Sequence, residues 1–238
     1  MNQGTHMNVT GLKQRLILFD LDGTLVDTST DICWALNALL LELGLNVVSE
    51  RDVRGWIGNG TPALVEHCLE ATGGNKRIRT VDALCRYLDL YEAHIDVGSR
   101  LYPGTLRTLG HLRVDGYRLG ICTNKPTYLA MKLLTALGIG KFFEVVIGGD
   151  AVRLPKPHPQ HILETIRSLS PESAGTDHVL MVGDAVNDVL AARAAEVPIA
   201  LMRYGYSTKP VESLNADWVL SSMAELPGLA ARYFSRMR

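Results

Sequence analysis

Two aspartates separated by one residue form the first group in the chain whose side chains can do chemistry. Asp20 and Asp22 lie in the run Phe19-Asp20-Leu21-Asp22-Gly23-Thr24-Leu25, directly after a short apolar segment. Two carboxylates this close repel each other unless a cation or a shared proton relieves the repulsion, so the pair favours a divalent metal ion. An ordinary solvated Asp-Gly turn is the structural alternative.

Further polar side chains follow two later apolar segments, and a lysine lies in a loop stiffened by prolines. They are Thr123, Asn124 and Lys125 after the first segment, Asp184 and Asp188 after the second, and Lys156 between Pro155 and Pro157. Each has an ordinary structural explanation by itself, such as a helix cap or an exposed charge. Together they place a hydroxyl, a cation and a carboxylate at strand ends, where open α/β proteins bind their ligands.

Six short apolar segments, partly β-branched, predict the buried strands that position these residues. They are 15–19, 117–122, 145–147, 178–182, 198–202 and 218–220. Helical patterns at 126–137, 159–168 and 186–196 alternate with these segments as they do in βαβ units. The predicted fold class is therefore α/β, with a Rossmann-like, mostly parallel sheet covered by helices on both faces.

Residues 28–100 break this alternation and contain no convincing strand. Helical patterns at 32–43, 64–71 and 81–94 fill the segment, with Thr61 as the predicted N-cap of the second helix. We therefore predict a core domain of residues 1–27 and 101–238, and an inserted helical cap domain of residues 28–100.

The composition excludes several classes of partner. The 24 Lys and Arg against 25 Asp and Glu give a formal net charge of −1, which offers no global field for nucleic acid or an anionic membrane. The four cysteines are scattered, and no run approaches the roughly 18 apolar residues of a membrane span. These features predict a cytoplasmic protein and do not exclude an anionic small molecule as its ligand. His158 and His161 are expected at the surface, because no carboxylate or cysteine completes a transition-metal site beside them.

In combination, the motifs resemble those of the haloacid dehalogenase-like hydrolase superfamily. The resemblance rests on Asp20-Leu-Asp22-Gly-Thr24, Thr123, Lys156 and Gly183-Asp184-x-x-x-Asp188, and it extends from residue 16 to about residue 206. The helical insertion between the first and second motifs is similar to the cap of that superfamily. The resemblance implies a sheet domain that performs phosphoryl chemistry beneath a lid.

The resemblance implies a role for each motif residue. Asp20 would be the nucleophile that forms an aspartyl-phosphate, and Asp22 would protonate the leaving oxygen and later accept a proton from water. Thr123, the backbone amide of Asn124, and Lys156 would bind the phosphoryl oxygens. An aspartate at position 22 points to a phosphatase or a phosphomutase.

The same resemblance implies a Mg²⁺ ion as cofactor. The carboxylates of Asp20 and Asp184 and the backbone carbonyl of Asp22 would hold the ion. Asp188 would orient the waters around the metal, and Thr24 would fix the turn after the first strand.

The cap must select among phosphate esters, since the sheet site treats most phosphoryl groups alike. The segment 54–61 carries three glycines and leads into a helix, so it can present backbone amides to an anion, although a plain turn between helices is the alternative. With Thr123-Asn124-Lys125 and with Gly148-Gly149-Asp150 ahead of Lys156, it resembles the phosphoglycolate phosphatase branch. This resemblance implies 2-phosphoglycolate as substrate, with its carboxylate met by Arg54, by the backbone amides around Gly58, Asn59 and Gly60, or by Lys125.

Several alternatives remain open at the level of the sequence. A phosphomutase, a pyrophosphatase, a nucleotidase or a phosphonate hydrolase carries nearly the same motifs. A phosphonate hydrolase of the phosphonoacetaldehyde type needs a cap lysine that forms a Schiff base, but Lys76, the only cap lysine, lies in a polar stretch. A binding module that has lost its chemistry is the least favoured hypothesis, and monomer and homodimer are both expected possibilities.

Overall fold

A six-stranded sheet forms the centre of the computed structural model, which describes residues 14–171 and 175–237. The strands are β1 (Leu16–Phe19), β4 (Arg118–Cys122), β5 (Val145–Ile147), β6 (Val179–Gly183), β7 (Ile199–Met202) and β8 (Trp218–Leu220). They lie in the order β5-β4-β1-β6-β7-β8, and each neighbouring pair is parallel. The predicted α/β class is confirmed, and the six predicted strands agree with the observed ones to within one residue at each end.

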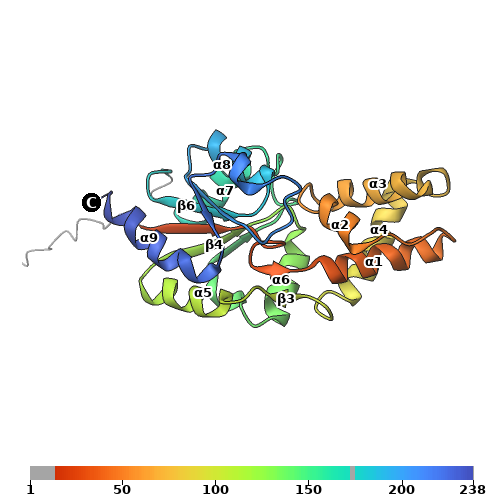
Figure 1. Ribbon diagram of the computed structural model, residues 1–238, viewed down its shortest axis with the longest axis horizontal. Coiled ribbons are helices and arrows are strands. Elements are labelled where there is room, and N and C mark those ends of the chain that lie inside the picture. The colour runs from red at the N-terminus through yellow and green to blue at the C-terminus, as the bar shows by residue number, and fades with distance from the viewer. Residues whose placement is uncertain (1–13, 172–174, 238) are drawn as a thin grey trace, which may run out of the picture.

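Helices cover both faces of the sheet because its strands bury side chains on both sides (Figure 1). The helices are α7 (Gln160–Leu169) and α8 (Val186–Ala194) on one face, and α5 (Thr105–Val114), α6 (Thr127–Ala136) and α9 (Leu226–Ser235) on the other. Leu16 and Leu18 of β1 pack into the first layer, whereas Ile17 and Phe19 pack into the second. This division follows from the alternation of side chains along a strand.

The segment between β1 and β4 folds mainly as helices that extend away from the sheet (Figure 1). They are α1 (Ser29–Glu42), α2 (Glu50–Trp56), α3 (Thr61–Thr72) and α4 (Thr80–Ala93). The helical cap is thereby confirmed, whereas its division from the core at residues 28 and 100 stays a prediction, and residues 1–13 of the predicted core lie outside the described part. The N-cap prediction for Thr61 is wrong by one residue, because Gly60, with a φ of 87°, occupies that position.

Some shorter elements were not predicted from the sequence. A two-stranded antiparallel sheet of β2 (Val26–Asp27) and β3 (Arg100–Leu101) joins the chain where it leaves the core to where it returns. Single-turn 3-10 helices complete the regular structure: η1 (Gly74–Lys76), η2 (Gly140–Phe142), η3 (Val211–Leu214) and η4 (Met223–Glu225).

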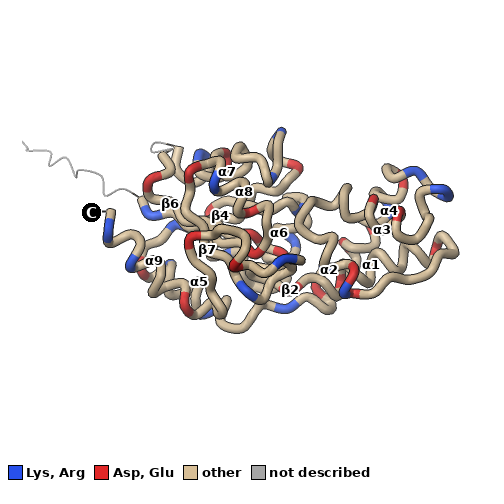
Figure 2. The backbone as a smooth tube through the Cα atoms, turned by 45° about the horizontal axis from the view of Figure 1, so that its top comes forward, with Lys and Arg blue, Asp and Glu red and all other residues tan. Residues whose placement is uncertain are grey.

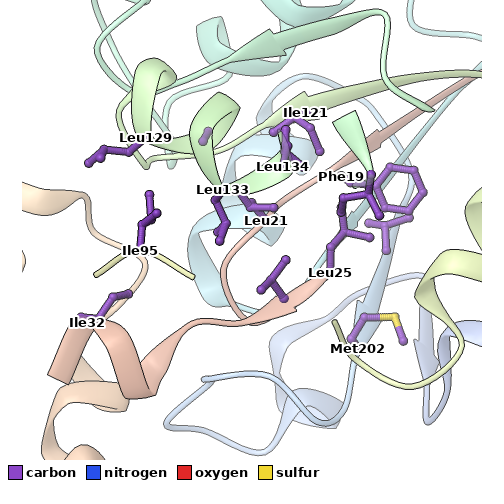
Figure 3. Close-up of a cluster of buried hydrophobic side chains, with 14 of the residues drawn as sticks. Phe19, Leu21, Leu25, Ile32, Ile95, Ile121, Leu129, Leu133, Leu134 and Met202 are labelled. Atoms are coloured by element: carbon purple, nitrogen blue, oxygen red, sulfur yellow. The ribbon is translucent and has the colours of Figure 1, made fainter. Parts of the chain in front are cut away.

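One hydrophobic cluster runs from the sheet into the base of the cap. Leu21 and Leu25, in the loop after β1, are fully buried in the same cluster as Phe19, Ile32 of α1 and Ile95 beyond α4 (Figure 3). Interior packing is dense and resists deformation. The base of the cap is therefore held by the same core that supports the end of β1.

Charged residues are distributed over both parts of the molecule. Figure 2 shows Lys and Arg interspersed with Asp and Glu along the whole tube. Among the described residues, none of the helices has the length and apolar character that crossing a membrane requires.

A buried aspartate ties the first cap helix to the segment that leaves the cap. Asp31 of α1 is fully buried, and its carboxylate accepts hydrogen bonds from the backbone N–H of Gly98 (2.6 Å) and of Ser99 (2.7 Å). The Ser99 hydroxyl (2.7 Å) and His94 Nδ1 (3.1 Å) complete its surroundings. A buried charge is tolerated only when it is paired and hydrogen-bonded in this way.

Replacing Asp31 is expected to destabilise the protein. Asp31→Ala leaves two backbone donors without an acceptor in a buried place, so the free energy of unfolding should fall by about 3 kcal/mol. Urea denaturation followed by circular dichroism measures the loss. Asp96→Ala, which removes an exposed carboxylate of the same segment, is the control, and an equal effect of the two substitutions would contradict this role of Asp31.

Candidate active site

Three strand ends meet where the sheet order reverses. β1 lies between β4 and β6. The chain first adds β4 and β5 on one side of β1 and then adds β6, β7 and β8 on the other. Asp20 follows β1, Thr123 follows β4, and Asp184 follows β6. A crevice opens at such a switch point in open parallel sheets, and ligands bind there. The topology therefore brings together residues that are far apart in the sequence.

The loop after β1 is tight, and it needs glycine at one position. The Leu21 carbonyl accepts hydrogen bonds from the backbone N–H of Leu25 (3.0 Å) and Val26 (3.1 Å), which closes the loop. Gly23 has a φ of 83°, and a Cβ there would lie 2.5 Å from Asp184 Oδ2. Both the backbone conformation and the close approach of Asp184 require the absence of a side chain.

Three buried carboxylates lie together at this edge. Ligand oxygens of Asp20, Asp184 and Asp188 lie within 4.8 Å of one another. Burial raises the pKa of Asp20 to about 6, although the Lys156 ammonium opposes the shift. Burial, together with the charges of Asp188 and Asp20, raises the pKa of Asp184 well above its usual value. Crowded carboxylates of this kind favour a bound cation.

The hydrogen bonds around the three carboxylates differ, and they indicate which oxygens remain for a metal. Asp188 uses both oxygens, because Oδ1 accepts from Lys156 Nζ (2.6 Å) and Oδ2 from the backbone N–H of Asp184 and Ala185 (3.1 Å each). Asp20 Oδ1 is buried and accepts no hydrogen bond from the described residues, although Lys156 Nζ lies 3.1 Å away. An oxygen-rich site with an unsatisfied carboxylate oxygen fits a hard divalent cation.

Asp184 is held in a fixed orientation by neighbours on three sides. Thr24 Oγ1 donates to its Oδ1 (2.9 Å), and the backbone N–H of Tyr206 donates to its Oδ2 (2.7 Å). A Cβ at Gly205 would overlap the Asp184 side chain, so this position too leaves room for the carboxylate. The predicted supporting residue Thr24 thus contacts Asp184 directly.

Lys156 lies between two of the carboxylates. Its ammonium is 2.6 Å from Asp188 Oδ1 and 3.1 Å from Asp20 Oδ1, and the side chain is buried. Burial by itself would lower the pKa of Lys156, but Asp188 and Asp20 outweigh that effect and raise it. The Lys156 carbonyl accepts from Asn124 Nδ2 (2.8 Å), which ties its loop to the end of β4.

His161 supports the same loop and is not a surface residue. The prediction that His161 is exposed is wrong, because the side chain is fully buried. Nδ1 accepts from the Lys156 backbone N–H (3.3 Å), and Nε2 lies 3.1 Å from the Ile147 carbonyl. An imidazole that accepts at Nδ1 and donates at Nε2 is neutral. Burial, followed by the charge of Lys156, lowers the pKa of His161 to about 4.

The cavity beside Asp20 lies between the core and the cap. Its volume is about 40 Å³, and the residues that line it are Asp20, Asp22, Ile32, Ile57, Gly58, Gly60, Thr61, Leu64, Tyr87, Tyr91, Thr123, Asn124 and Lys125. Lys125 donates to both oxygens of Asp22 (3.1 Å each) and to the Tyr91 hydroxyl (2.7 Å). Asp22 is thus at the cavity wall, and its carboxylate lies outside the group formed by Asp20, Asp184 and Asp188.

The glycine-rich cap segment lies over this cavity. The Gly58 carbonyl accepts from Asn124 Nδ2 (2.8 Å) and from Asn187 Nδ2 (3.1 Å). Gly58 and Gly60 line the cavity, whereas Asn59 faces an adjoining one, where its Oδ1 accepts from Asn187 Nδ2 (2.8 Å). The structure therefore brings the backbone of this segment, but not the Asn59 side chain, to the site.

Arg54 lies outside the cavity, in ion pairs within the molecule. Its guanidinium is 2.8 Å from Asp27 Oδ2 and 3.1 Å from Glu50 Oε1, and it lies over the Tyr206 ring at 5.1 Å. Tyr206, which the sequence analysis did not identify, donates from its hydroxyl to Asp27 and accepts from the backbone N–H of Thr28 (2.6 Å). This network joins the loop that holds Asp184 to the start of α1.

Comparison with known proteins defines the class. A family model described as haloacid dehalogenase-like hydrolase matches residues 17–202. The chain is 40% identical over 212 residues to the phosphoglycolate phosphatase of Caulobacter vibrioides. This alignment covers 89% of this chain and 88% of that protein. It is 38% identical over 214 residues to the phosphoglycolate phosphatase of Yersinia pseudotuberculosis, covering 89% and 91% of the two chains.

A solved structure supports the same relationship. The crystal structure of a protein described as a "predicted phosphoglycolate phosphatase" from Haemophilus somnus 129PT aligns with a TM-score of 0.85 and 31% identity, covering 91% of this chain and 97% of that one. The chain belongs to the haloacid dehalogenase-like hydrolase family. Within it, the chain is similar to phosphoglycolate phosphatases along most of its length.

The neutral state of His161 predicts a pH dependence of stability. Above pH 6.5 the imidazole is neutral in both the folded and the unfolded chain, and its contribution is complete. As the pH falls from 6.5 to about 4, the unfolded chain binds a proton that the folded protein does not, so stability is lost across this window. The loss amounts to about 3 kcal/mol.

Urea denaturation at pH values from about 7.5 to about 4.5 tests this expectation. The free energy of unfolding of His161→Asn should fall less steeply with decreasing pH than that of the wild type. His111→Asn, at an exposed helical position, should follow the wild-type slope. Equal slopes for wild type and His161→Asn would show that His161 does not carry the effect.

Proposed function

We propose that this hydrolase is a Mg²⁺-dependent phosphatase that converts 2-phosphoglycolate to glycolate and phosphate. The observation that carries the proposal is the convergence of Asp20, Asp22, Thr123, Lys156 and Asp184 on one edge of the sheet, beside a cavity between the core and the cap. The names of the relatives support the choice of substrate.

Asp20 acts as the nucleophile in this proposal. One of its oxygens attacks phosphorus, the ester P–O bond breaks, and an aspartyl-phosphate forms. Asp22, at the cavity wall, gives a proton to the leaving oxygen of glycolate and then accepts a proton from the water that attacks the aspartyl-phosphate. The second step releases phosphate and restores the Asp20 carboxylate.

Three groups at the strand ends bind the phosphoryl oxygens. The Thr123 hydroxyl accepts from the Lys125 backbone N–H (3.3 Å) and keeps its own hydrogen for a phosphoryl oxygen. The backbone amide of Asn124 and the Lys156 ammonium act beside it. Donors that are held in place before the reaction stabilise the charge of the transition state without having to reorganise.

Asp20, Asp184 and the backbone carbonyl of Asp22 would hold Mg²⁺, and Asp188 and Thr24 keep the first two in position. The ion would offset the repulsion between Asp20 and the phosphate dianion and polarise the phosphoryl group. Asp188 acts through its hydrogen bonds to Lys156 and to the backbone beside Asp184, because both of its oxygens are engaged.

The cavity limits the size and charge of the substrate. Its volume of about 40 Å³ favours a small leaving group. Among the described residues that line it, Lys125 is the one cationic side chain, and Gly58 is the predicted cap residue beside it. Arg54 and Asn59 remain candidates only if the cap moves, since both are held elsewhere.

Phosphate release from a panel of esters tests the chemistry and the substrate together. The panel contains 2-phosphoglycolate, sugar phosphates, nucleotides and pyrophosphate, each with Mg²⁺ or with EDTA. We expect 2-phosphoglycolate to be preferred, EDTA to abolish release, and Asp20→Asn to lower kcat/KM by about 1,000-fold or more, because no nucleophile remains. Asp96→Asn is the matched control. A higher kcat/KM for another ester of the panel would contradict the proposed substrate. Phosphate release that does not need a metal ion would contradict the proposed mechanism.

The other reaction types have distinct outcomes. A phosphomutase converts a sugar phosphate to its isomer in the presence of an activating bisphosphate and releases little phosphate. A pyrophosphatase would prefer pyrophosphate within the panel. Lys76 is exposed, which disfavours a Schiff-base phosphonate hydrolase. A non-catalytic binding module would release no phosphate from any ester, and sedimentation would distinguish a monomer from a homodimer.

A further inference from the structure

A lysine of the core and a tyrosine of the cap form a buried contact across the cavity. Lys125, in the loop after β4, donates from Nζ to the Tyr91 hydroxyl of α4 at 2.7 Å, and Nζ lies 4.4 Å from the centre of the Tyr91 ring. The Lys125 side chain is 3% exposed, and Tyr91 is 1% exposed. The contact exists only when α4 lies against the end of β4, so it belongs to the closed arrangement of cap and core.

The same ammonium also binds the proposed general acid. Lys125 Nζ lies 3.1 Å from each oxygen of Asp22. With both oxygens engaged by the lysine, Asp22 is turned toward Nζ rather than toward a leaving group. The three donors of an ammonium are independent, however, so Lys125 can exchange Asp22 for another anion while it keeps Tyr91.

The Tyr91 hydroxyl can donate a hydrogen bond beside the Lys125 ammonium. Its hydroxyl oxygen accepts from Lys125, and no acceptor for its own hydrogen is present among the described residues. A buried hydroxyl usually satisfies its hydrogen as well as its oxygen. The free donor and the ammonium therefore face the cavity together, where a ligand atom can accept from both.

The charges around the cavity indicate what that ligand is. Asp20 and Asp22 line the cavity with one cation, Lys125, while Lys156 lies between Asp20 and Asp188 and is assigned to the phosphoryl group. A substrate with a second anion beyond its phosphate needs a separate cation at the cap side. Lys125 is in that position, and Arg54 is not, because Asp27 and Glu50 already engage it.

We infer that Lys125 and Tyr91 are the residues that select the leaving group, by binding a carboxylate on the far side of the phosphate ester. The inference rests on the proposed function and deepens it. The carboxylate takes the place of Asp22 on Lys125 and accepts the Tyr91 hydroxyl hydrogen. Asp22, released from Lys125, takes up a proton from water and turns toward the leaving oxygen. An ester without an anionic leaving group leaves Lys125 on Asp22 and is turned over poorly.

The test compares two substrates of nearly equal size, 2-phosphoglycolate and 2-hydroxyethyl phosphate, which carries a hydroxymethyl group in place of the carboxylate. Lys125 also contacts Asp22, so its replacement can lower kcat/KM for both substrates. The readout is therefore the ratio of the two kcat/KM values, because a loss that is the same for both substrates leaves this ratio unchanged. Lys125→Met, which keeps the length without the charge, should lower this ratio about 100-fold, and Tyr91→Phe about 10-fold. Tyr117→Phe, which removes the hydroxyl of a buried tyrosine in the core domain, should leave the ratio unchanged.

Binding supplies a second readout that does not depend on turnover. Calorimetry on Asp20→Asn with Mg²⁺ should give a lower Kd for 2-phosphoglycolate than for 2-hydroxyethyl phosphate. Adding Lys125→Met to this variant should remove the difference, and circular dichroism verifies that the double variant is folded.

The outcomes separate the inference from the proposed function. If the wild type prefers 2-phosphoglycolate but Lys125→Met and Tyr91→Phe keep its ratio, the inference is overturned and the proposed function stands. If the wild type turns over both esters equally, the proposed substrate and the inference both fail. If no ester is hydrolysed, the proposed function fails, and a carboxylate-dependent Kd that Lys125→Met abolishes would still support the pair as an anion site.

Discussion

The mutual repulsion of buried carboxylates at the edge of the sheet is the constraint on which the rest of the site depends. Asp20, Asp184 and Asp188 lie within 4.8 Å of one another with little access to water, so each must be neutralised or hydrogen-bonded. Lys156 supplies one buried charge to Asp20 and Asp188, and the backbone N–H groups after β6 also donate to Asp188. Asp184 accepts hydrogen bonds from the Thr24 hydroxyl and the Tyr206 backbone. Asp20 Oδ1 is paired with Lys156 Nζ at 3.1 Å but accepts no hydrogen bond from the described residues, so a bound cation would stabilise this oxygen further.

The loops around the carboxylates are built to maintain this arrangement. Glycine at positions 23 and 205 gives the Asp184 side chain its space, and Thr24 and the Tyr206 backbone fix its orientation. Asn124 extends the same support, because its amide donates to the Lys156 loop and to the Gly58 carbonyl of the cap. Catalytic groups that are held before the substrate arrives lose little freedom during the reaction. The rigid core and the cap segment thus share hydrogen bonds at the site itself.

Substrate selectivity, in the proposed function, arises where cap and core meet. In the proposed mechanism the core provides a nucleophile and phosphoryl-binding donors for many esters, and residues of α1, α3 and α4 and of the segment before α3 form the cap side of the cavity. Lys125 contacts Tyr91 across this boundary, and Tyr206 joins the Asp184 loop to the start of α1. The position of the cap and the arrangement of the carboxylates are therefore linked through shared side chains, which suits the proposed function, since a cap over the site would exclude water.

The sequence by itself determined the parallel sheet, the helical insertion and the order of the motif residues, because short apolar segments, helical periods and Asp-x-Asp-Gly-Thr are local patterns. It also placed Asp20, Asp184 and Lys156 at one edge, since strand ends of a parallel sheet converge there. It could not identify His161, Tyr91 or Tyr206, whose types are common and whose partners are distant: 34 residues separate Tyr91 from Lys125, and 178 separate Tyr206 from Thr28. The sequence also could not exclude Arg54 from the cavity. A cation binds either a ligand or a carboxylate of the protein, and the choice depends on which groups the packing brings within about 3 Å of it. Only the tertiary structure decided those contacts, since hydrogen bonds and ion pairs depend on distances that no local pattern encodes.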